Sequence, residues 1–263
     1  MLTNLTSCTD VSYKARVNKA DKLALLSRMT KNVIKTNNFL LTVYQRIQDP
    51  NANFVFYIEG DGLIYHYDDI SDNPTPLTPT VLELAAIDHR PNVVYIARPC
   101  QYTSLTLQPN CKNEYWTNKR FALEVVDSIN EAIDKISQNH TCEIIGYSGG
   151  GGIAVLIAAM NPKVQNIITI AANLDHVAFN NFHHTLHMTG SLNPIDYSQK
   201  IRNIPQLHLS GTDDKIVPSF IADKFVRLAN STCVKTMRLK SVTHSNGWKN
   251  FWPNIIKQKL SCS

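Results

Sequence analysis

The sequence contains no apolar run of about 20 residues, the length that an α-helix needs to cross a bilayer, so it predicts no transmembrane segment. Its six cysteines include no CxxC pair, which excludes the spacing of a zinc ribbon. Lys and Arg are scattered and the net charge is only +5, so we expect no nucleic-acid partner. Low-complexity tracts, internal repeats and Pro/Gly/Ser-rich linkers are also missing. A chain of 263 residues, 43% of them hydrophobic, is then expected to fold around a substantial core.

The start of the chain leaves the cellular compartment open. A complete secretory signal is absent, but "MLTNLTSC" resembles the end of a lipoprotein signal, with Cys8 where lipid would attach. If an upstream part is missing, the protein is exported to the periplasm or anchored by lipid; if the match is chance, it is cytoplasmic. Cys100 and Cys111 flank the polar loop "PCQYTSLTLQPNC" and could form a disulfide in an oxidising compartment or stay free thiols in a reducing one.

Strand-like and helix-like segments alternate along most of the chain. Apolar and β-branched runs predict strands at residues 39–47, 53–58, 92–97, 142–147, 166–171, 205–211 and 234–239. Helical spacing or composition predicts helices near 20–29, 118–136, 152–160 and 249–260. The turn signal "QDPNAN" joins the first two strands as a hairpin-like pair, which would give the sheet an antiparallel edge. Otherwise the alternation predicts an α/β fold, a mostly parallel central sheet with helices on both faces.

The expected organisation is an N-terminal segment with a helix at residues 1–38, followed by one α/β domain at 39–263. Within that domain, the stretch 175–202 is rich in His, Asn and other polar residues and has weak periodicity. We expect it to form a small lid.

Glycine is scarce, yet five of the 10 glycines lie in "CEIIGYSGGGGIAVLIAAM", around Ser148. The segment Gly146–Gly150 fits G-x-S-x-G between a predicted strand and a predicted helix, as a nucleophile elbow requires. The flanking glycines avoid Cβ collisions in so sharp a turn. The positive end of the following helix, with the N–H of Gly149, is suited to stabilise an oxyanion.

Glycine-rich turns between a strand and a helix also bind phosphates, so a nucleotide site is the alternative for this turn. This turn lacks the G-K-[ST] ending of a P-loop and does not spell G-x-G-x-x-G. A nucleotide site is therefore disfavoured.

A nucleophilic serine needs a histidine base and an orienting carboxylate. "PQLHLSGTDDKIVP" predicts a strand followed by a loop with Asp213 and Asp214, and "VKTMRLKSVTHSNGW" a strand followed by a loop with His244. The order Ser, Asp, His, each just after a strand, is the order that this chemistry uses on such sheets. Asp175 also follows a strand and is a competing candidate for the acid.

These motifs together resemble the α/β-hydrolase superfamily over roughly residues 40–260. "GTDDKIVP" is similar to the family's acid loop, G-x-x-D-x-x-V-P, which implies Asp214 as the acid with Asp213 as the fallback. "THSNGW" matches the histidine loop at His244. "ARPCQY", "YWTNKRF" and "NLD" further resemble a bacterial subgroup, a likeness that names no substrate.

The family's second oxyanion donor follows an early strand, often as H-G-G or H-G-x. Here the equivalent reads "YIEGDG", with Glu59 in place of His, so the resemblance implies the N–H of Asp61, or of Gly60, as the donor. Further residues are candidates for the wall of the pocket, namely Glu59, Tyr147, Arg98, Tyr102 and Trp248. For several of these a purely structural role is the alternative.

His183, His184 and His187 have spacings that a metal could use on a helix, but no HExxH-type acid accompanies them, and lid histidines are the commoner case. We expect no metal and no cofactor. The function expected is a serine hydrolase that cleaves a small-molecule acyl compound, most simply a carboxylic ester, through an acyl-enzyme. The alternatives are a peptidase or acyltransferase with the same residues, a non-catalytic binding protein on this fold, and an envelope-associated interaction protein. The sequence does not indicate an oligomeric state.

Overall fold

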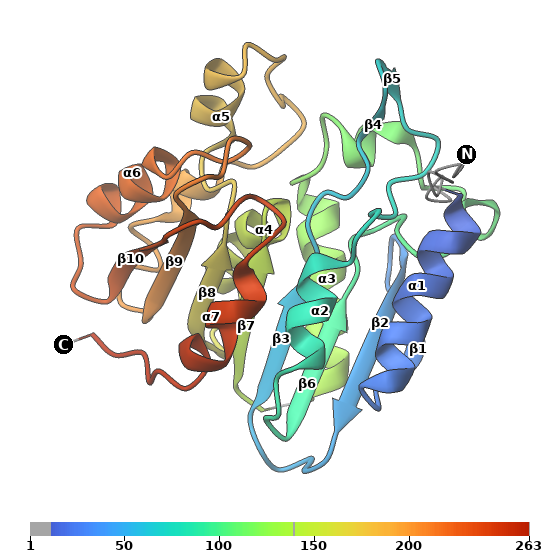
Figure 1. Cartoon of the computed structure of the whole chain (residues 1–263), viewed down its shortest axis with the longest axis horizontal. Coiled ribbons are helices and arrows are strands. Elements are labelled where there is room, and N and C mark those ends of the chain that lie inside the picture. The colour runs from blue at the N-terminus through green and yellow to red at the C-terminus, as the bar shows by residue number, and fades with distance from the viewer. Residues whose placement is uncertain (1–11, 139, 263) are drawn as a thin grey trace, which may run out of the picture.

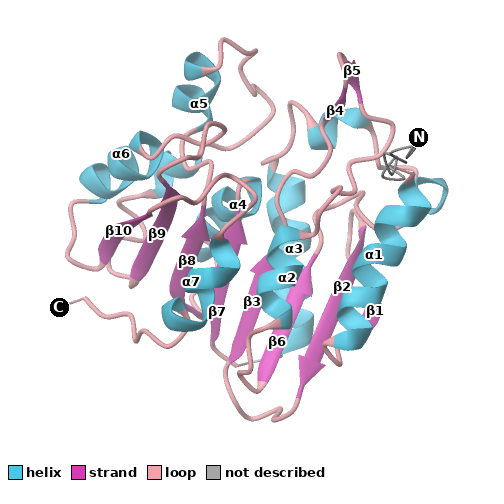
Figure 2. Ribbon diagram, viewed as in Figure 1, coloured by secondary structure: helices cyan, strands magenta, loops and turns pink. Residues whose placement is uncertain are grey.

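The computed structural model describes residues 12–138 and 140–262, in which eight strands form one central sheet (Figures 1 and 2). The order across the sheet is β1-β2-β6-β3-β7-β8-β9-β10. The strands are β1 (Thr30–Lys35), β2 (Leu40–Ile47), β3 (Phe54–Ile58), β6 (Asn92–Ile96), β7 (Cys142–Tyr147), β8 (Val164–Ile170), β9 (Gln206–Gly211) and β10 (Val234–Leu239). The missing numbers belong to a separate small hairpin of β4 (Tyr65–His66) and β5 (Asp69–Ile70).

The six strands from β6 to β10 are parallel, and the sheet is antiparallel only at one edge. There, β2 pairs antiparallel with both β1 and β6. The parallel strands are almost wholly apolar because helices cover both of their faces. The mostly parallel α/β fold expected from the sequence is therefore confirmed.

Helices pack against the sheet in two layers, each with its own apolar core. One layer holds α3 (Leu123–Ser137), α4 (Gly149–Ala158) and α6 (Phe220–Ala229), and the other holds α1 (Tyr13–Leu26), α2 (Thr80–Ala86) and α7 (Trp248–Ile255). In Figure 1 the second layer lies in front of the sheet. A further short helix, α5 (His176–Phe182), stands with the β4–β5 hairpin beyond the carboxyl ends of the strands. The remaining elements are three 3-10 turns, η1 (Leu105–Leu107), η2 (Asn113–Trp116) and η3 (Pro194–Tyr197).

One pairing expected from the sequence is wrong. The hairpin-like pair at 39–47 and 53–58 does not form, because β6 lies between β2 and β3 and pairs with both. The antiparallel edge exists, but it is built by β1 and β2. Strand β1 was not expected at all: "TKNVIK" is polar and mostly exposed, since it is the last strand of the sheet.

The N-terminal part of the described chain is attached to the main fold. Helix α1 starts earlier than the sequence indicates, with the Ser12 side chain accepting a hydrogen bond from Ala15 N as its N-cap. Ala20 and Ala24 are buried in the second core, and the Tyr44 hydroxyl donates to Asp21. Strand β1 precedes the boundary that we placed at residue 38. The lipid-attachment candidate, Cys8, lies outside the described residues.

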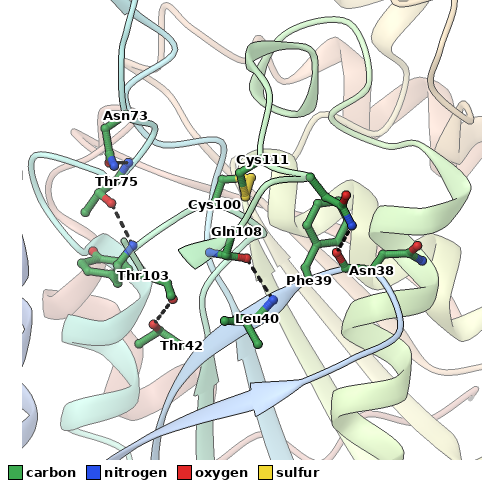
Figure 3. Close-up of a disulfide and its surroundings, with 12 residues drawn as sticks. Asn38, Phe39, Leu40, Thr42, Asn73, Thr75, Cys100, Thr103, Gln108 and Cys111 are labelled. Atoms are coloured by element: carbon green, nitrogen blue, oxygen red, sulfur yellow. Dashed lines mark hydrogen bonds between the residues drawn. A yellow bond between two sulfur atoms is a disulfide. The ribbon is translucent and has the colours of Figure 1, made fainter. Parts of the chain in front are cut away.

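Two disulfides are formed within the described part of the chain, Cys100–Cys111 and Cys233–Cys262, and the second was not expected. The first closes the loop that follows β6 (Figure 3). Gln108, inside this loop, accepts a hydrogen bond from Leu40 N at 2.9 Å, and the Thr103 and Thr42 hydroxyls are 2.8 Å apart. The loop is thereby fixed to the start of β2. Cys142, which begins β7, is buried and free.

No helix in residues 12–138 or 140–262 is both long enough and apolar enough to span a membrane.

Candidate active site

Ser148 occupies a sharp turn between β7 and α4 at the carboxyl edge of the sheet. Its backbone is left-handed, with φ 52° and ψ −120°, a strained conformation for a residue with a side chain. Cβ atoms on Gly146 and Gly150 would lie 2.3 Å from the carbonyl oxygens of Gly150 and Ile58, respectively, which no structure tolerates. The two glycines therefore let the turn close against β3 and hold the serine hydroxyl out of the sheet.

Three side chains from separate loops form one chain of hydrogen bonds at this edge. Nε2 of His244, from the loop after β10, is 3.1 Å from Oγ of Ser148. Nδ1 of the same ring is 2.9 Å from Oδ2 of Asp214, from the loop after β9. The Asp214 carboxylate is fully buried, whereas the imidazole is 18% exposed. A neutral imidazole that donates from Nδ1 to the carboxylate presents Nε2 as an acceptor for the serine proton.

The carboxylate of Asp214 is held in place by hydrogen bonds to its other oxygen, Oδ1, which distinguishes it from the carboxylate of Asp213. Oδ1 accepts hydrogen bonds from the backbone N–H groups of Ile216 and Val217, at 2.8 and 2.9 Å. The Asp213 carboxylate is exposed and accepts from the Thr212 hydroxyl instead. Of the two adjacent acids, only Asp214 contacts the imidazole.

The competing acid, Asp175, is engaged elsewhere. Its Oδ1 caps the start of α5 by accepting from Val177 N and Ala178 N, and it also accepts from Asn193. Its Oδ2 is 2.5 Å from Nζ of Lys224. Burial opposes ionisation here, but the hydrogen bonds from Asn193 and Lys224 outweigh it and hold the pKa of Asp175 below its ordinary value.

Two aromatic residues named from the sequence hold the histidine loop in place. The Trp248 indole donates to the backbone oxygen of His244 at 2.8 Å, and the Tyr147 hydroxyl donates to the same oxygen at 3.2 Å. The Tyr147 ring also lies 5.2 Å from the imidazole, centre to centre. Tyr147 directly precedes Ser148 in the elbow, and Trp248 follows the histidine loop. The two contacts therefore set the position of the imidazole relative to Ser148.

The loop after β3 reaches Ser148 from the other side. A Cβ on Gly60 would lie 3.3 Å from Cβ of Ser148, so its backbone touches the serine. The Gly60 N–H, however, already donates to Oε1 of Glu59 at 2.9 Å, and its carbonyl accepts from Gln101. Of the two oxyanion candidates in this loop, the N–H of Gly60 is therefore already engaged.

The Asp61 side chain lies over the start of α4 between two arginines. A Cβ on Gly149 would be 1.9 Å from Oδ1 of Asp61, so the carboxylate lies directly against this glycine. Oδ1 is 3.1 Å from Nη1 of Arg98 and Oδ2 is 3.0 Å from Nη1 of Arg120. Two guanidinium groups thus offset the charge of a carboxylate that lies beside the place where an oxyanion would form.

Glu59 is buried next to this loop. Its Oε2 accepts from the Tyr95 hydroxyl at 3.0 Å, and Oε1 from Gly60 N. Burial raises the pKa of Glu59 to about 7, because loss of hydration outweighs these hydrogen bonds.

A cavity of about 420 Å³ lies above Ser148 and His244, and we call it the catalytic cavity. Of the residues named from the sequence, it is lined by Glu59, Gly60, Asp61, Tyr147, Ser148 and His244. Three expected wall residues, Arg98, Tyr102 and Trp248, are buried behind the wall instead. Arg98 and Trp248 support residues that do line the cavity, and the Tyr102 ring packs edge-on against Tyr44 and Tyr95.

The model of a serine hydrolase family, FSH1, matches residues 88–247, more than half of the chain and the part that includes Ser148, Asp214 and His244. The chain belongs to the FSH1 serine hydrolase family. No curated protein sequence matches it.

Solved structures similar to this serine hydrolase have the α/β-hydrolase fold. Est1E from Butyrivibrio proteoclasticus superposes with a TM-score of 0.60 at 12% identity, covering 86% of this chain and 96% of its own. The esterase Pf2001 from Pyrococcus furiosus gives 0.59 at 11% identity, covering 87% and 88%. The acylaminoacyl peptidase of Pyrococcus horikoshii gives 0.59 at 13% identity, covering 82% of this chain and 37% of its own. At such identities the likeness establishes the fold alone.

Sequence reasoning missed Arg120 in this serine hydrolase. The residue lies in "YWTNKRF" before α3, binds Asp61 and lines the catalytic cavity. Nothing in its sequence surroundings distinguishes it from Lys119 beside it, because its partner is 59 positions away. Ile64, Phe179 and Ile216 were missed in the same way; they line the cavity from three different loops or helices.

The three histidines considered for a metal do not form a cluster of ligands. Among the residues that the structure describes, no group of three or more His, Cys, Asp or Glu side chains could hold an ion. His183, His184 and His187 lie after α5, and Nε2 of His183 is 2.7 Å from the carbonyl oxygen of Ile216.

Proposed function

We propose that the protein hydrolyses a carboxylic ester, with Ser148 as nucleophile, His244 as general base and acid, and Asp214 as the group that orients the imidazole. The observation that carries this proposal is the continuous chain of hydrogen bonds from Oγ of Ser148 through the His244 ring to Oδ2 of Asp214. Membership of a serine hydrolase family supports it independently.

In the proposed reaction, Oγ of Ser148 attacks the carbonyl carbon of the ester while Nε2 of His244 takes the hydroxyl proton. The carbonyl oxygen becomes an oxyanion, which the N–H groups of Gly149 and Asp61 stabilise. Gly149 is the first residue of α4, so its N–H has no hydrogen-bond partner within the helix. Each such donor contributes about 10²–10³ in rate.

The tetrahedral intermediate then collapses. The bond to the alcohol breaks, the alcohol leaves with the proton held on His244, and the acyl group stays on Ser148. Water attacks this acyl-enzyme as His244 takes its proton, and a second collapse releases the acid and restores the serine hydroxyl. The buried Asp214 carboxylate stabilises the imidazolium at both stages.

Labelling by a fluorophosphonate probe and turnover of short p-nitrophenyl esters test this proposal. We expect wild-type protein to show both and Ser148→Ala to show neither. Labelling that persists in Ser148→Ala would contradict the assignment of the nucleophile. Turnover of a peptide anilide faster than of the ester would favour a peptidase, and the absence of both labelling and turnover would favour a binding protein.

Asp213 and Asp214 provide a matched pair for the orienting group. We expect Asp214→Asn to lower kcat by about 10⁴, because the amide stabilises the wrong imidazole tautomer. Asp213→Asn, one residue away, should leave kcat close to the wild-type value, because the Asp213 carboxylate is exposed and accepts from Thr212 rather than from the imidazole. Equal losses in the two variants would exclude Asp214 from this role.

A further inference from the structure

A second cavity, of about 860 Å³, lies beside the catalytic cavity, and we call it the side cavity. Its walls come from the β4–β5 hairpin, from α5 and the loop after it, and from the segments before α3 and after β9. In Figure 1 the hairpin and α5 stand beyond the carboxyl edge of the sheet. The apolar part of its lining consists of Ile64, Tyr65, Ile70, Phe179, Leu186, Met188 and Ile216.

The side cavity and the catalytic cavity adjoin. They share four lining residues, of which Ile64, Phe179 and Ile216 are apolar and Arg120 is charged. The charge of Arg120 is already held by Asp61, and two further N–H groups face the sulfur of Met188. A substrate whose carbonyl group lies at Ser148 can therefore extend along an apolar path into the side cavity.

Several apolar side chains of the side cavity, in the β4–β5 hairpin and in the loop after α5, are exposed. Leu186 is 92% exposed, Tyr65 56% and Ile70 43%. Apolar side chains from two separate elements that converge on one hollow are typical of a site for an apolar ligand. The volume lies in the range of small-molecule sites, which is about 300–1,000 Å³.

The wall of the side cavity is joined to the catalytic residues. His183, after α5, contacts the carbonyl oxygen of Ile216, and Ile216 N donates to Asp214. The side cavity therefore has a fixed position relative to Ser148.

We propose that the side cavity binds a hydrocarbon chain of the substrate, so that the enzyme is selective for esters with a medium or long apolar chain. This inference rests on the proposed ester hydrolysis. The chain belongs to either the acid or the alcohol part of the ester; the chemistry of the contact is the same, and the test separates the two.

Two series of esters test the proposal. In one, the acyl chain grows from acetyl to decanoyl on a constant p-nitrophenol; in the other, acetate is esterified with alcohols of increasing length. We expect kcat/KM to rise about threefold to fourfold for each added methylene in the series whose chain enters the side cavity, the effect of burying one CH₂. A flat or falling profile in both series would overturn the proposal.

Variants on both walls locate the effect, and each has a control in the same hairpin or in the adjoining helix. Ile70→Glu and Leu186→Glu place a charge in the side cavity, whereas Tyr67→Glu in the hairpin and Val177→Glu in α5 change exposed apolar residues that line neither cavity. The measurement is the ratio of kcat/KM for the longest ester to that for the shortest. We expect the two lining variants to lose at least about tenfold in this ratio, since a chain beside a carboxylate stays partly hydrated, and the two controls to keep it.

Equal changes in lining and control variants would exclude the side cavity as the binding site. Failure of this inference is distinguishable from failure of the proposed function. If Ser148-dependent labelling and short-ester turnover are present while the chain-length profile is flat, only the side cavity proposal fails. If labelling and turnover are absent in wild-type protein, ester hydrolysis itself fails and the inference with it.

Discussion

Glu59 carries a carboxyl group in a place where its charged form is poorly hydrated. Its pKa is raised from 4.5 to about 7 by burial, so the folded protein holds this proton more tightly than the unfolded chain. Glu59 therefore contributes most to stability below pH 4.5, and the contribution is lost as the pH rises through 7. The difference between the two pKa values corresponds to about 3 kcal/mol.

We predict that Glu59→Gln removes this pH dependence, because a neutral amide of the same shape does not titrate. The measurement is urea unfolding of both proteins at pH 4.5 and pH 8. The free energy of unfolding of wild type, relative to the variant, should fall by about 3 kcal/mol between the two pH values. A constant difference would show that the carboxyl group is hydrated in the native protein.

Asp61 is the single carboxylate between two largely buried guanidinium groups. We predict that Asp61→Asn lowers the free energy of unfolding by about 3–5 kcal/mol, because Arg98 and Arg120 would stay buried without an opposite charge. Asp223→Asn is the control, since Asp223 pairs with Arg238 at the surface and should cost less than about 1 kcal/mol. Denaturant titration of both variants decides the matter, and equal losses would contradict the buried character of the Asp61 cluster.

At this scale the sequence predicts residues well where a motif fixes the backbone and poorly where contacts are distant. Ser148, Asp214 and His244 each follow a strand in a recognisable loop, and the structure brings their side chains together. Arg120 has no such motif, and its partner Asp61 belongs to another loop. The sequence also indicates that Trp248 and Tyr147 lie near the histidine, but not that both bind its carbonyl oxygen.

At the scale of elements, the segment between β6 and α3 provides the two arginines that pair with Asp61 beside Ser148. Arg98, Gln101 and Arg120 all belong to it and bind Gly60 or Asp61. The Cys100–Cys111 disulfide lies within this segment, 11 positions apart, whereas Cys233–Cys262 spans 29 positions. Cys233 directly precedes β10 and so lies at the amino ends of the parallel strands, whereas Ser148 lies at their carboxyl ends.

We predict that replacing both Cys100 and Cys111 with Ala lowers the free energy of unfolding by about 3 kcal/mol, from the loop length. It should also lower ester turnover, because the support of Asp61 loosens. The matched pair, Cys233 and Cys262 replaced with Ala, should cost about 3.5 kcal/mol but leave turnover unchanged at temperatures where the variant is folded. Unfolding curves and turnover at 25 °C check both statements. Loss of turnover in the second pair alone would contradict them.

The elements that the sequence predicts correctly are those with strong local patterns. The strands at 142–147 and 234–239 have the predicted bounds because they are short apolar or alternating runs between clear turns. The sequence does not indicate strand β1, because its lysines interrupt the apolar pattern. It does not indicate α2 either, because several prolines precede that helix. The order of β2, β6 and β3 depends on pairing between distant segments, which a local turn signal cannot reveal.

At the scale of the whole molecule, one sheet separates two apolar cores that have no helix in common. Helices α3, α4 and α6 cover one face and α1, α2 and α7 the other. The eight strands from β1 to β10 pair without a break, so a single continuous sheet lies between the two cores. Because both cores pack on the same strands, unfolding of one core would expose the sheet backbone on which the other core packs.

The three tryptophans report on the two cores separately: Trp116 belongs to the first, and Trp248 and Trp252 to the second. We predict a single cooperative unfolding transition despite the length of the chain. In Trp116→Phe, only the second core fluoresces; in the double variant Trp248→Phe with Trp252→Phe, only the first does. Each variant's urea midpoint by fluorescence should coincide with its own midpoint by circular dichroism, since coincident probes are the mark of one transition. Fluorescence midpoints that depart from circular dichroism in opposite directions would show instead that the two faces of the sheet unfold in separate steps.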